Sequence, residues 1–223
     1  MLSATEAYNT LLAAYGTPRW WSEDPFVVLV QSVLVQNTTW STVEKTWAAL
    51  GGRLTPEAVE RLSGQELERL IAPCGFQKAK ACTIRELAGW FRGYGCDPRR
   101  LEEVPLPQLR GELLALRGIG PETADVILVY AFYRPSFVID AYTRRLLDRL
   151  GYGFPDDDAI RCFFEEGLPR DARVYGQFHW LILDHCILRC RKVPRCGQCP
   201  FRDRCRYPAE AEKAALEGRE KWN

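Results

Sequence analysis

Apolar residues recur at a spacing near 3.6 along most of the chain, for example at Leu67, Leu70 and Ile71. This is the period of an amphipathic helix, and the alternation typical of strands is almost absent. Glycines and prolines interrupt the pattern at intervals of ordinary helix length. The breaks lie at Gly16–Pro18, Asp24–Pro25, Gly51–Gly52, Gly75, Gly93–Pro98, Gly118–Pro121, Arg134–Pro135 and Gly151–Pro155. The pattern predicts an all-α fold of some ten helices, with a further charged helix after Pro208.

The longest apolar runs, Phe26–Val35 and Val126–Tyr133, are shorter than the roughly 20 residues that span a bilayer. The first residues carry no basic flank and no long apolar run, so they do not resemble a secretory signal. We expect a cytoplasmic protein that does not span a membrane.

The composition is that of an ordinary soluble globular protein, with 47% apolar and 26% charged residues among 223. Thirty basic against 29 acidic side chains give a formal net charge of +1, which excludes a wholly basic coat. A local basic face is still possible, so nucleic-acid binding has to be judged from where the charges lie.

A glycine-flanked turn separates two amphipathic segments at Leu116-Arg117-Gly118-Ile119-Gly120, and Pro121 opens the second segment. Glycines on both sides of one apolar residue allow a sharp reversal anchored by Ile119. Backbone N–H groups at the start of the second helix could bind a DNA phosphate. A plain corner between two helices would explain the same glycines.

An apolar run from Phe137 to Ile139 ends at Asp140, which begins the next predicted helix. Aspartate at this position is a common N-cap. As a cap, Asp140 would also present a partly buried carboxylate to whatever lies in front of that helix.

The two segments L-R-G-I-G-P-E-T-A-D and V-I-D-A-Y-T-R-R together resemble the helix-hairpin-helix (HhH-GPD) DNA glycosylases of the endonuclease III superfamily. The resemblance implies that Asp140 is catalytic and that Gly118, Ile119 and Gly120 contact DNA. One carboxylate suits this chemistry, because cleavage of the glycosidic bond develops positive charge on the sugar. Asp140 would also orient or deprotonate the attacking water.

Members of the family that also cut the strand carry a lysine two residues after the second hairpin glycine, where this chain has Glu122. Glutamate cannot form an imine, so the resemblance points to a monofunctional enzyme without lyase activity. Glu122 could line the base pocket or simply favour the first turn of its helix.

Adenine mismatch glycosylases carry a glutamate that protonates the leaving base, and the alignment on Val35-Gln36-Asn37-Thr38 puts Ser32 at that position. A base alkylated on a ring nitrogen is already cationic and leaves without that acid. Trp20, Trp21 and Trp40 could stack on such a base, although core packing is the commoner role for any one tryptophan.

The motifs W-W-S-x-x-P-F, V-L-V-Q-N-T and G-F-Q-K-A-K resemble the 3-methyladenine glycosylase branch of the superfamily. A lysine of that branch's pocket would fall at Leu181, which is a departure. By the same resemblance Gln36 enters the duplex where the base has left, and Gln77, beside Phe76 in the Gly75–Lys80 loop, belongs to a second wedge.

Four of the nine cysteines crowd into the segment CRKVPRCGQCPFRDRC, at Cys190, Cys196, Cys199 and Cys205. Their spacing suits one [4Fe–4S] cluster or one zinc ion. The resemblance to the iron–sulfur loop of endonuclease III favours the [4Fe–4S] cluster, although the first gap is one residue short and Cys186 is a weaker substitute for Cys190. The other five cysteines, at Cys74, Cys82, Cys96, Cys162 and Cys186, are expected to be buried.

Basic residues surround these four cysteines, with only Asp203 opposing them. They are Arg189, Arg191, Lys192, Arg195, Arg202, Arg204 and Arg206. They could meet phosphates, in which case DNA affinity would fall steeply with salt. His179 and His185 are expected to be packing or capping residues.

The resemblance implies a bilobal protein in which residues 20–133 form a six-helix barrel, and residues 1–19 and 134–223 form an iron–sulfur domain. The lesion would enter a cleft between them. We expect a monomer that acts on double-stranded DNA with a damaged base, such as 3-methyladenine. Two alternatives are a glycosylase for oxidised pyrimidines, uracil or mismatched thymine, and a non-catalytic DNA-binding iron–sulfur protein.

Overall fold

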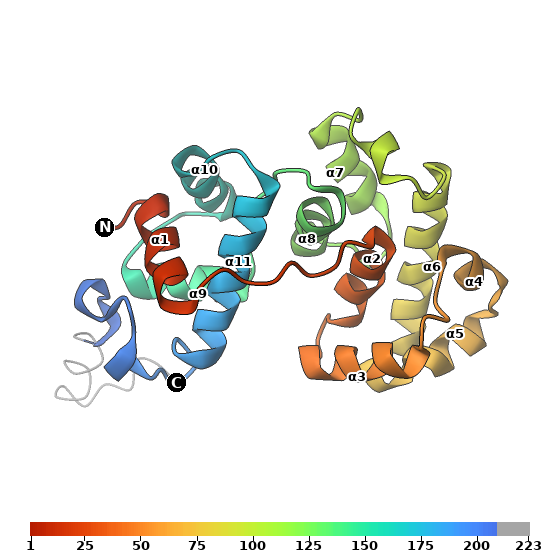
Figure 1. Cartoon of the computed structure of the whole chain (residues 1–223), viewed down its shortest axis with the longest axis horizontal. Coiled ribbons are helices and arrows are strands. Elements are labelled where there is room, and N and C mark those ends of the chain that lie inside the picture. The colour runs from red at the N-terminus through yellow and green to blue at the C-terminus, as the bar shows by residue number, and fades with distance from the viewer. Residues whose placement is uncertain (209–223) are drawn as a thin grey trace. The chain divides into compact units, whose positions relative to one another are not determined.

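The computed structural model describes residues 1–208, and these residues are helical throughout (Figure 1). They contain eleven α-helices and four short 3-10 helices, and no β-strand occurs among them. The all-α prediction is therefore confirmed. The helix predicted after Pro208 lies outside the described residues.

The chain divides into two compact units. Unit 1 consists of Met1–Arg19 and the residues from Phe137 onward, and unit 2 consists of Trp20–Ser136. The second boundary lies a few residues after the expected position at 133.

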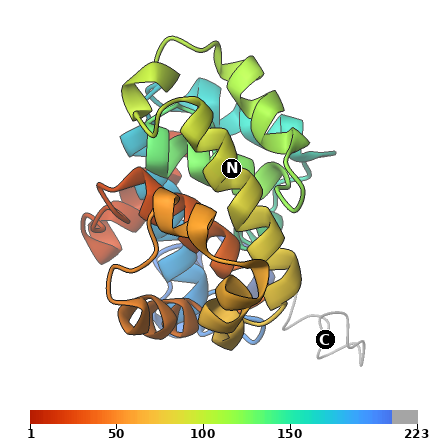
Figure 2. The ribbon, with the colours of Figure 1, turned by 90° about the vertical axis from the view of Figure 1, so that its right-hand side faces the viewer.

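Unit 2 is built around α2 (Pro25–Leu34), which is buried on most of its circumference and packs against α6 and α8. Figure 2 shows α6 crossing in front of the other helices of this unit. The remaining elements are α3 (Trp40–Leu50), α4 (Pro56–Arg61), α5 (Gly64–Ile71), η1 (Ala72–Cys74), α6 (Gln77–Gly93), η2 (Pro98–Leu101), α7 (Leu106–Ala115) and α8 (Pro121–Phe132). The near-continuous apolar sequence of α2 explains its central place, because a helix that is apolar on all sides can only be buried.

Unit 1 is built around α11, which packs against α1 and α9. Its elements are α1 (Ala4–Tyr15), α9 (Ala141–Leu150), α10 (Asp157–Gly167), α11 (Ala172–Leu188), η3 (Cys196–Gln198) and η4 (Arg202–Arg204). Phe137, Phe164 and Phe178 form an aromatic core in which the first two rings stack at 3.9 Å between centroids. This core buries the segment that leads from Phe137 to Asp140.

Several helices start at polar residues that cap their first turn. Asp24, Thr39 and Asp140 each accept a hydrogen bond from a backbone N–H of the first turn. Such caps satisfy donors that have no partner inside the helix and stabilise it by about 1 kcal/mol each. The helix positions, and with them the site residues, are thus fixed locally.

The prediction that all five scattered cysteines are buried is wrong in part. Cys74 and Cys186 are buried, but Cys82 and Cys96 are half-buried and Cys162 is exposed. Cys162 lies on the outer face of α10, whose buried residues are Ile160 and Phe164. For Cys82 in α6 and Cys162 in α10, helical position and not the burial preference of cysteine decides the exposure, whereas Cys96 lies in the turn after α6.

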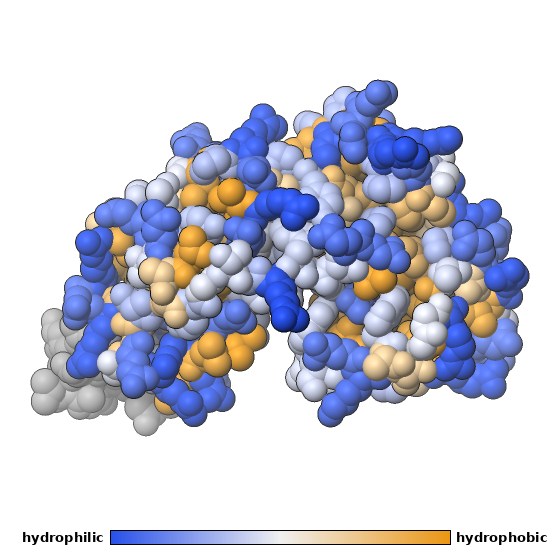
Figure 3. All heavy atoms as spheres, in the orientation of Figure 1, coloured by the Kyte–Doolittle hydropathy of each residue, from blue (hydrophilic) through white to orange (hydrophobic). Residues whose placement is uncertain are grey.

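No helix in residues 1–208 is both long enough and apolar enough to cross a membrane. On the face drawn in Figure 3, hydrophilic side chains cover most of each unit, with apolar patches between them.

Candidate functional site

The turn between α7 and α8 requires glycine at one position. Gly118 has a φ of +81°, and a Cβ placed on it would lie 2.3 Å from Oγ1 of Thr83 on α6. Real Cβ atoms do not approach other atoms so closely, and this φ also disfavours other residues. Ile119 is only 6% exposed, so the predicted anchor of the turn in the core is present.

Side chains from two other elements hold the turn in place. Glu86 of α6 accepts a hydrogen bond from the backbone N–H of Arg117 at 2.9 Å. Gln36 Nε2 donates to the Gly118 carbonyl oxygen at 3.1 Å and to Thr123 Oγ1 at 3.0 Å. The structure thus joins Gln36 to the hairpin, a contact that the sequence did not indicate.

The outer surface of the turn keeps hydrogen-bonding capacity. Gly118 and Gly120 are exposed, and their backbone N–H groups donate to no acceptor found within residues 1–208. Glu122 is exposed in the first turn of α8, where an acid is favoured by the helix dipole. The turn is therefore open to a phosphate on its glycine edge.

A buried ion pair fixes the two helices that flank the turn. Arg110 Nε of α7 lies 2.8 Å from Asp125 Oδ1 of α8, and Asp125 is 1% exposed. Ser136 Oγ donates to the same oxygen at 2.7 Å. The carboxylate is thus held between α7 and the end of unit 2.

The second predicted DNA-contacting loop presents its phenylalanine outward. Phe76 is 67% exposed with a φ of +49°, whereas the neighbouring Gln77 is half-buried. An exposed aromatic ring in a left-handed backbone conformation is uncommon and marks a position of interest. Of the two residues at the predicted wedge, Phe76 and Gln77, Phe76 is the more exposed.

The three tryptophans gather in one aromatic cluster of unit 2 that also contains Tyr130 and Tyr133. Trp21 and Trp40 meet edge to face at 5.0 Å between centroids, and Trp20 stacks on Tyr133 at 5.3 Å. All three tryptophans are half-buried. Trp21 Nε1 donates to Gln31 Oε1 at 2.6 Å, which orients the indole. The sequence alone did not single out the two tyrosines or Gln31.

Ser32 and Leu181, which align with an acid and a lysine in the base pockets of other glycosylases, are both buried. Ser32 is 3% exposed, and its hydroxyl donates to the Leu29 carbonyl oxygen of its own helix at 2.8 Å. Leu181 is fully buried in unit 1. Neither side chain is an acid or a base.

Asp140 is the N-cap of α9 and is 4% exposed. Its Oδ1 accepts a hydrogen bond from the Thr143 N–H at 2.7 Å. Its Oδ2 lies 3.7 Å from Nε2 of His179, which is itself 5% exposed. The cap predicted at this position is therefore present, and the sequence did not reveal the histidine beside it.

Some features around Asp140 raise its pKa and others lower it. Burial raises the pKa of Asp140, while the nearby imidazole of His179 and the hydrogen bond from the Thr143 N–H lower it. The lowering effects prevail, so the pKa lies below the ordinary value of 3.8 and the carboxylate is ionised at neutral pH. A buried anion of this kind can stabilise positive charge that develops nearby.

The four clustered cysteines line one small hollow in unit 1, together with Arg149 and Tyr207. Within residues 1–208, no three histidine, cysteine or acidic side chains are placed closely enough to hold a single metal ion. The four cysteine side chains nevertheless line one cavity that no other cysteine of residues 1–208 lines. Its donor set, four thiols without a carboxylate, suits a soft metal or an iron–sulfur cluster.

Two buried side chains of helices α9 and α11 support these cysteines. Arg149, 7% exposed, donates to Cys190 Sγ at 3.3 Å and to the Arg191 carbonyl oxygen at 2.6 Å. His185, fully buried, lies between Tyr15 Oη at 2.8 Å and Cys199 Sγ at 3.8 Å. His185 was expected to be a packing or capping residue, and no sequence pattern indicated the contact of Arg149 with Cys190.

The same groups favour a thiolate at Cys190. A hydrogen bond with Cys186, and further contacts with His185 and Arg149, lower the pKa of Cys190 against the effect of burial. Burial raises the pKa of Cys199 to about 11 and also raises that of Cys205. The basic residues around the loop are exposed, except Arg189, which is half-buried.

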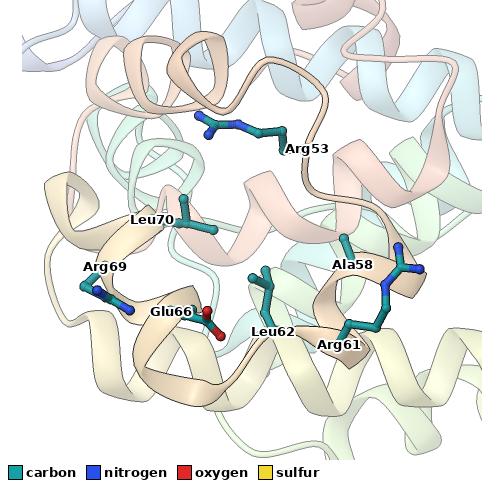
Figure 4. A pocket seen from close by; sticks show the side chains of 7 residues that line it. All are labelled: Arg53, Ala58, Arg61, Leu62, Glu66, Arg69 and Leu70. Atoms are coloured by element: carbon teal, nitrogen blue, oxygen red, sulfur yellow. The ribbon is translucent and has the colours of Figure 1, made fainter.

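A separate hollow of about 570 Å³ lies between α4, α5 and the segment after α3 (Figure 4). Arg53, Arg61 and Arg69 line it, with Leu62 and Leu70 on its apolar side. None of the side chains that the sequence assigned to a site lines this hollow.

The chain is similar to known DNA repair proteins in sequence and in fold. Residues 30–169 match the HhH-GPD superfamily of base excision DNA repair proteins. The chain is 39% identical over 205 residues to a protein of Methanocaldococcus jannaschii named "Putative DNA repair glycosylase MJ1434", covering 89% of this chain and 93% of that one. It is 27% identical over 188 residues to an endonuclease III of Sulfolobus acidocaldarius, covering 82% of each chain.

A crystal structure of an H. pylori 3-methyladenine DNA glycosylase bound to 1,N6-ethenoadenine is similar in fold. The TM-score is 0.72 at 26% identity, covering 82% of this chain and 97% of that chain. These matches confirm the resemblance inferred from the hairpin and the Asp140 segment. The chain belongs to the HhH-GPD superfamily of base excision DNA repair proteins and is a DNA glycosylase of that superfamily.

Proposed function

We propose that the protein is a monofunctional glycosylase that hydrolyses the bond between an alkylated base and its deoxyribose in double-stranded DNA. Asp140 carries the proposal, because it is a buried carboxylate kept ionised by its neighbours. As the base departs, this anion would stabilise the cationic sugar and orient the attacking water. No covalent intermediate with the protein forms on this route.

Two side chains support hydrolysis without a covalent intermediate and the choice of a cationic base. Glu122 occupies the position at which strand-cutting relatives carry a lysine, and a carboxylate cannot form an imine. Ser32 stands where mismatch glycosylases carry a proton-donating glutamate, and its hydroxyl is bonded to its own helix. A neutral purine would lack an acid here, whereas an alkylated base already carries the charge it needs to leave.

The aromatic cluster of unit 2 would receive the extruded base. Indole and phenol faces attract a cation by about 0.5–2 kcal/mol per contact. Trp20, Trp21 and Trp40 offer such faces. Trp20 packs on Tyr130 and Tyr133, Trp21 packs on Tyr130, and Trp40 packs on Trp21. Lesions without a positive charge would gain less from this cluster.

DNA binding would use the glycine edge of the hairpin, with Gln36 and the Phe76–Gln77 loop at the extruded base. The exposed backbone N–H groups of Gly118 and Gly120 suit a phosphate, as does the start of α8. Phe76 is apolar and projects, which suits insertion between bases. We propose that the protein binds DNA as a monomer.

The four cysteines Cys190, Cys196, Cys199 and Cys205 would hold a [4Fe–4S] cluster. They fit this group because they share one hollow and because Arg149 contacts Cys190 Sγ and can offset negative charge on the sulfur. When bound, the cluster would cross-link the loop to the end of α11. Arg149 would meanwhile hold the loop backbone through the carbonyl oxygens of Arg191 and Lys192.

A panel of duplexes, each with one defined lesion, tests the proposal. The lesions are 3-methyladenine, 1,N6-ethenoadenine, oxidised pyrimidines, uracil and mismatched thymine, and each reaction is assayed with and without alkali. Release of an alkylated base, with strand cleavage only after alkali, is the expected result. Preferred release of a pyrimidine would favour the second candidate function, a pyrimidine or mismatch glycosylase. The similarity to a Pyrobaculum aerophilum protein named "Thymine/uracil-DNA glycosylase", 26% identical over 187 residues, supports this candidate. Binding without release of any base would leave only a DNA-binding role.

A further inference from the structure

The chain contains only two histidines, and both are buried on α11. His185 faces the cysteine loop, and His179 faces Asp140. A histidine in an apolar core is usually a packing residue, but His179 has an ionised carboxylate as its neighbour. His179 therefore affects the charge of Asp140 in addition to filling space in the core.

We infer that His179 is a positioning residue for the proposed reaction, which holds the carboxylate of Asp140 in one orientation with Oδ2 facing the imidazole. The inference rests on the proposed function, because it concerns the group to which that function assigns the chemistry. His179 is assigned no direct contact with the substrate.

The two oxygens of Asp140 have different partners from different helices. Thr143 of α9 donates its N–H to Oδ1, as in any capped helix, and this contact depends only on local sequence. Oδ2 has the imidazole of α11, 39 residues away along the chain. Contacts on both oxygens restrict the rotamer of this buried carboxylate, so the direction of its charge is set before the substrate binds.

The same contact keeps the carboxylate charged. Burial alone would raise the pKa of Asp140, and His179 contributes the largest opposing effect. Without the imidazole, the largest effect that lowers the pKa of Asp140 would be lost, so this pKa would rise. Activity that needs the anion would then be lost at a higher pH as the solution is acidified.

Other groups around the carboxylate are weaker candidates for this role. Cys186, also on α11, interacts electrostatically with Asp140, but its thiol pKa is raised and it is neutral at pH 7. Thr143 carries no charge. His179 is the partner that can both donate a hydrogen bond and carry positive charge.

The test compares single-turnover base release by wild type, His179→Ala and His179→Gln from about pH 7 to about pH 4. We expect His179→Ala to lower the rate on the order of 10²-fold, since small errors in position have effects of this size. We also expect its acidic limb to move to higher pH, with DNA affinity unchanged. His179→Gln should recover part of the rate, because an amide N–H can replace the donor without its charge.

Gln177→Ala is the matched control on the same helix. It removes a hydrogen bond to Tyr8 at 2.9 Å and no contact with Asp140, so its pH profile should match wild type. Titration of the Asp140 carboxyl by carbon NMR in His179→Gln supplies a second readout if His179→Ala fails to fold. An unmoved acidic limb and an unmoved carboxyl titration in the folded His179 variants would overturn the inference.

Asp140→Asn separates this inference from the proposed function. If Asp140→Asn still releases the base, the proposed function itself is wrong. If Asp140→Asn is inactive while the His179 variants follow the wild-type pH profile, only the positioning role fails.

Discussion

Asp140 and the cysteine loop lie against the same helix, α11, and are built in different ways. His179 and His185 are six residues apart, about 9 Å along the helix axis, and each contacts one of the two regions. Asp140 is buried, and Thr143 and His179 of the protein contact its two oxygens. The cysteines line a hollow among exposed arginines and lysine, and some of their thiols have pKa values raised by burial.

This difference indicates what each region needs. The aspartate site is complete once α9 and α11 have packed, so a substitution there should change chemistry and leave the fold intact. The cysteine loop is short of regular structure and would depend on the group it binds. A substitution there should first change stability, and activity only as a consequence.

The largest effect is expected for Asp140→Asn. Asparagine caps a helix about as well as aspartate, so the fold should persist, but the negative charge is lost. Base release should fall by at least about 10²–10³-fold while DNA affinity is retained. Single-turnover release and fluorescence anisotropy measure the two quantities.

Asp156→Asn is the matched control for that substitution, since Asp156 caps α10 in the same way and lies in an exposed position. It should keep wild-type activity. Equal losses in both variants would mean that capping, and not charge at position 140, matters.

Cys190→Ala should cause the next largest change, in stability. Loss of one cluster ligand should remove most of the visible absorbance and lower the melting temperature by roughly 5–10 °C, because a structural metal site contributes several kcal/mol. Cys186→Ala, which changes a neighbouring thiol that lines no part of the hollow, should keep the absorbance. Loss of the visible absorbance in Cys186→Ala but not in Cys190→Ala would show that Cys186, and not Cys190, is the cluster ligand.

Gly118→Ala and Gly120→Ala test the hairpin. At position 118 the new methyl group would clash with Thr83 at a φ of +81°, whereas at position 120 it would meet open space. We expect Gly118→Ala to lower the free energy of unfolding by about 1–3 kcal/mol, and Gly120→Ala to lower it much less. Urea denaturation measures both, and similar values for the two variants would contradict the close packing of the turn against α6.

Lys192→Ala should have the smallest effect. If Lys192 meets a phosphate, its loss should reduce the salt dependence of DNA binding by about one unit of the log–log slope, without changing the rate of base release. Arg99→Ala, an exposed arginine of unit 2 paired with Asp97, is the control and should leave the slope unchanged. An unchanged slope in Lys192→Ala would exclude this residue from the DNA contact.

The sequence predicted the parts that depend on neighbouring residues. The helical period, the reversal at Gly118 and the cap at Asp140 are local, and the structure contains all three. It did not predict contacts between distant helices, such as His179 with Asp140, Arg149 with Cys190, or Gln36 with the hairpin. These depend on which faces meet after folding, and no local pattern records that.

Burial was predictable where the local pattern of neighbouring residues was clear. The buried Ile119 follows from its position between two glycines in the turn. The exposed Cys162 and the projecting Phe76 do not follow from their residue types, which are usually buried. The contacts of Tyr130 and Tyr133 with the tryptophans could not be predicted, because these residues lie far apart in the sequence.

Borohydride trapping on an alkylated-base duplex tests most directly whether water, and not an amine of the protein, attacks the sugar. Wild-type protein and substrate are mixed with borohydride, and the products are separated on a denaturing gel with and without alkali. If water attacks the sugar, we expect free base, a strand that breaks only in alkali, and no protein–DNA cross-link. A cross-link, or strand cleavage without alkali, would contradict it.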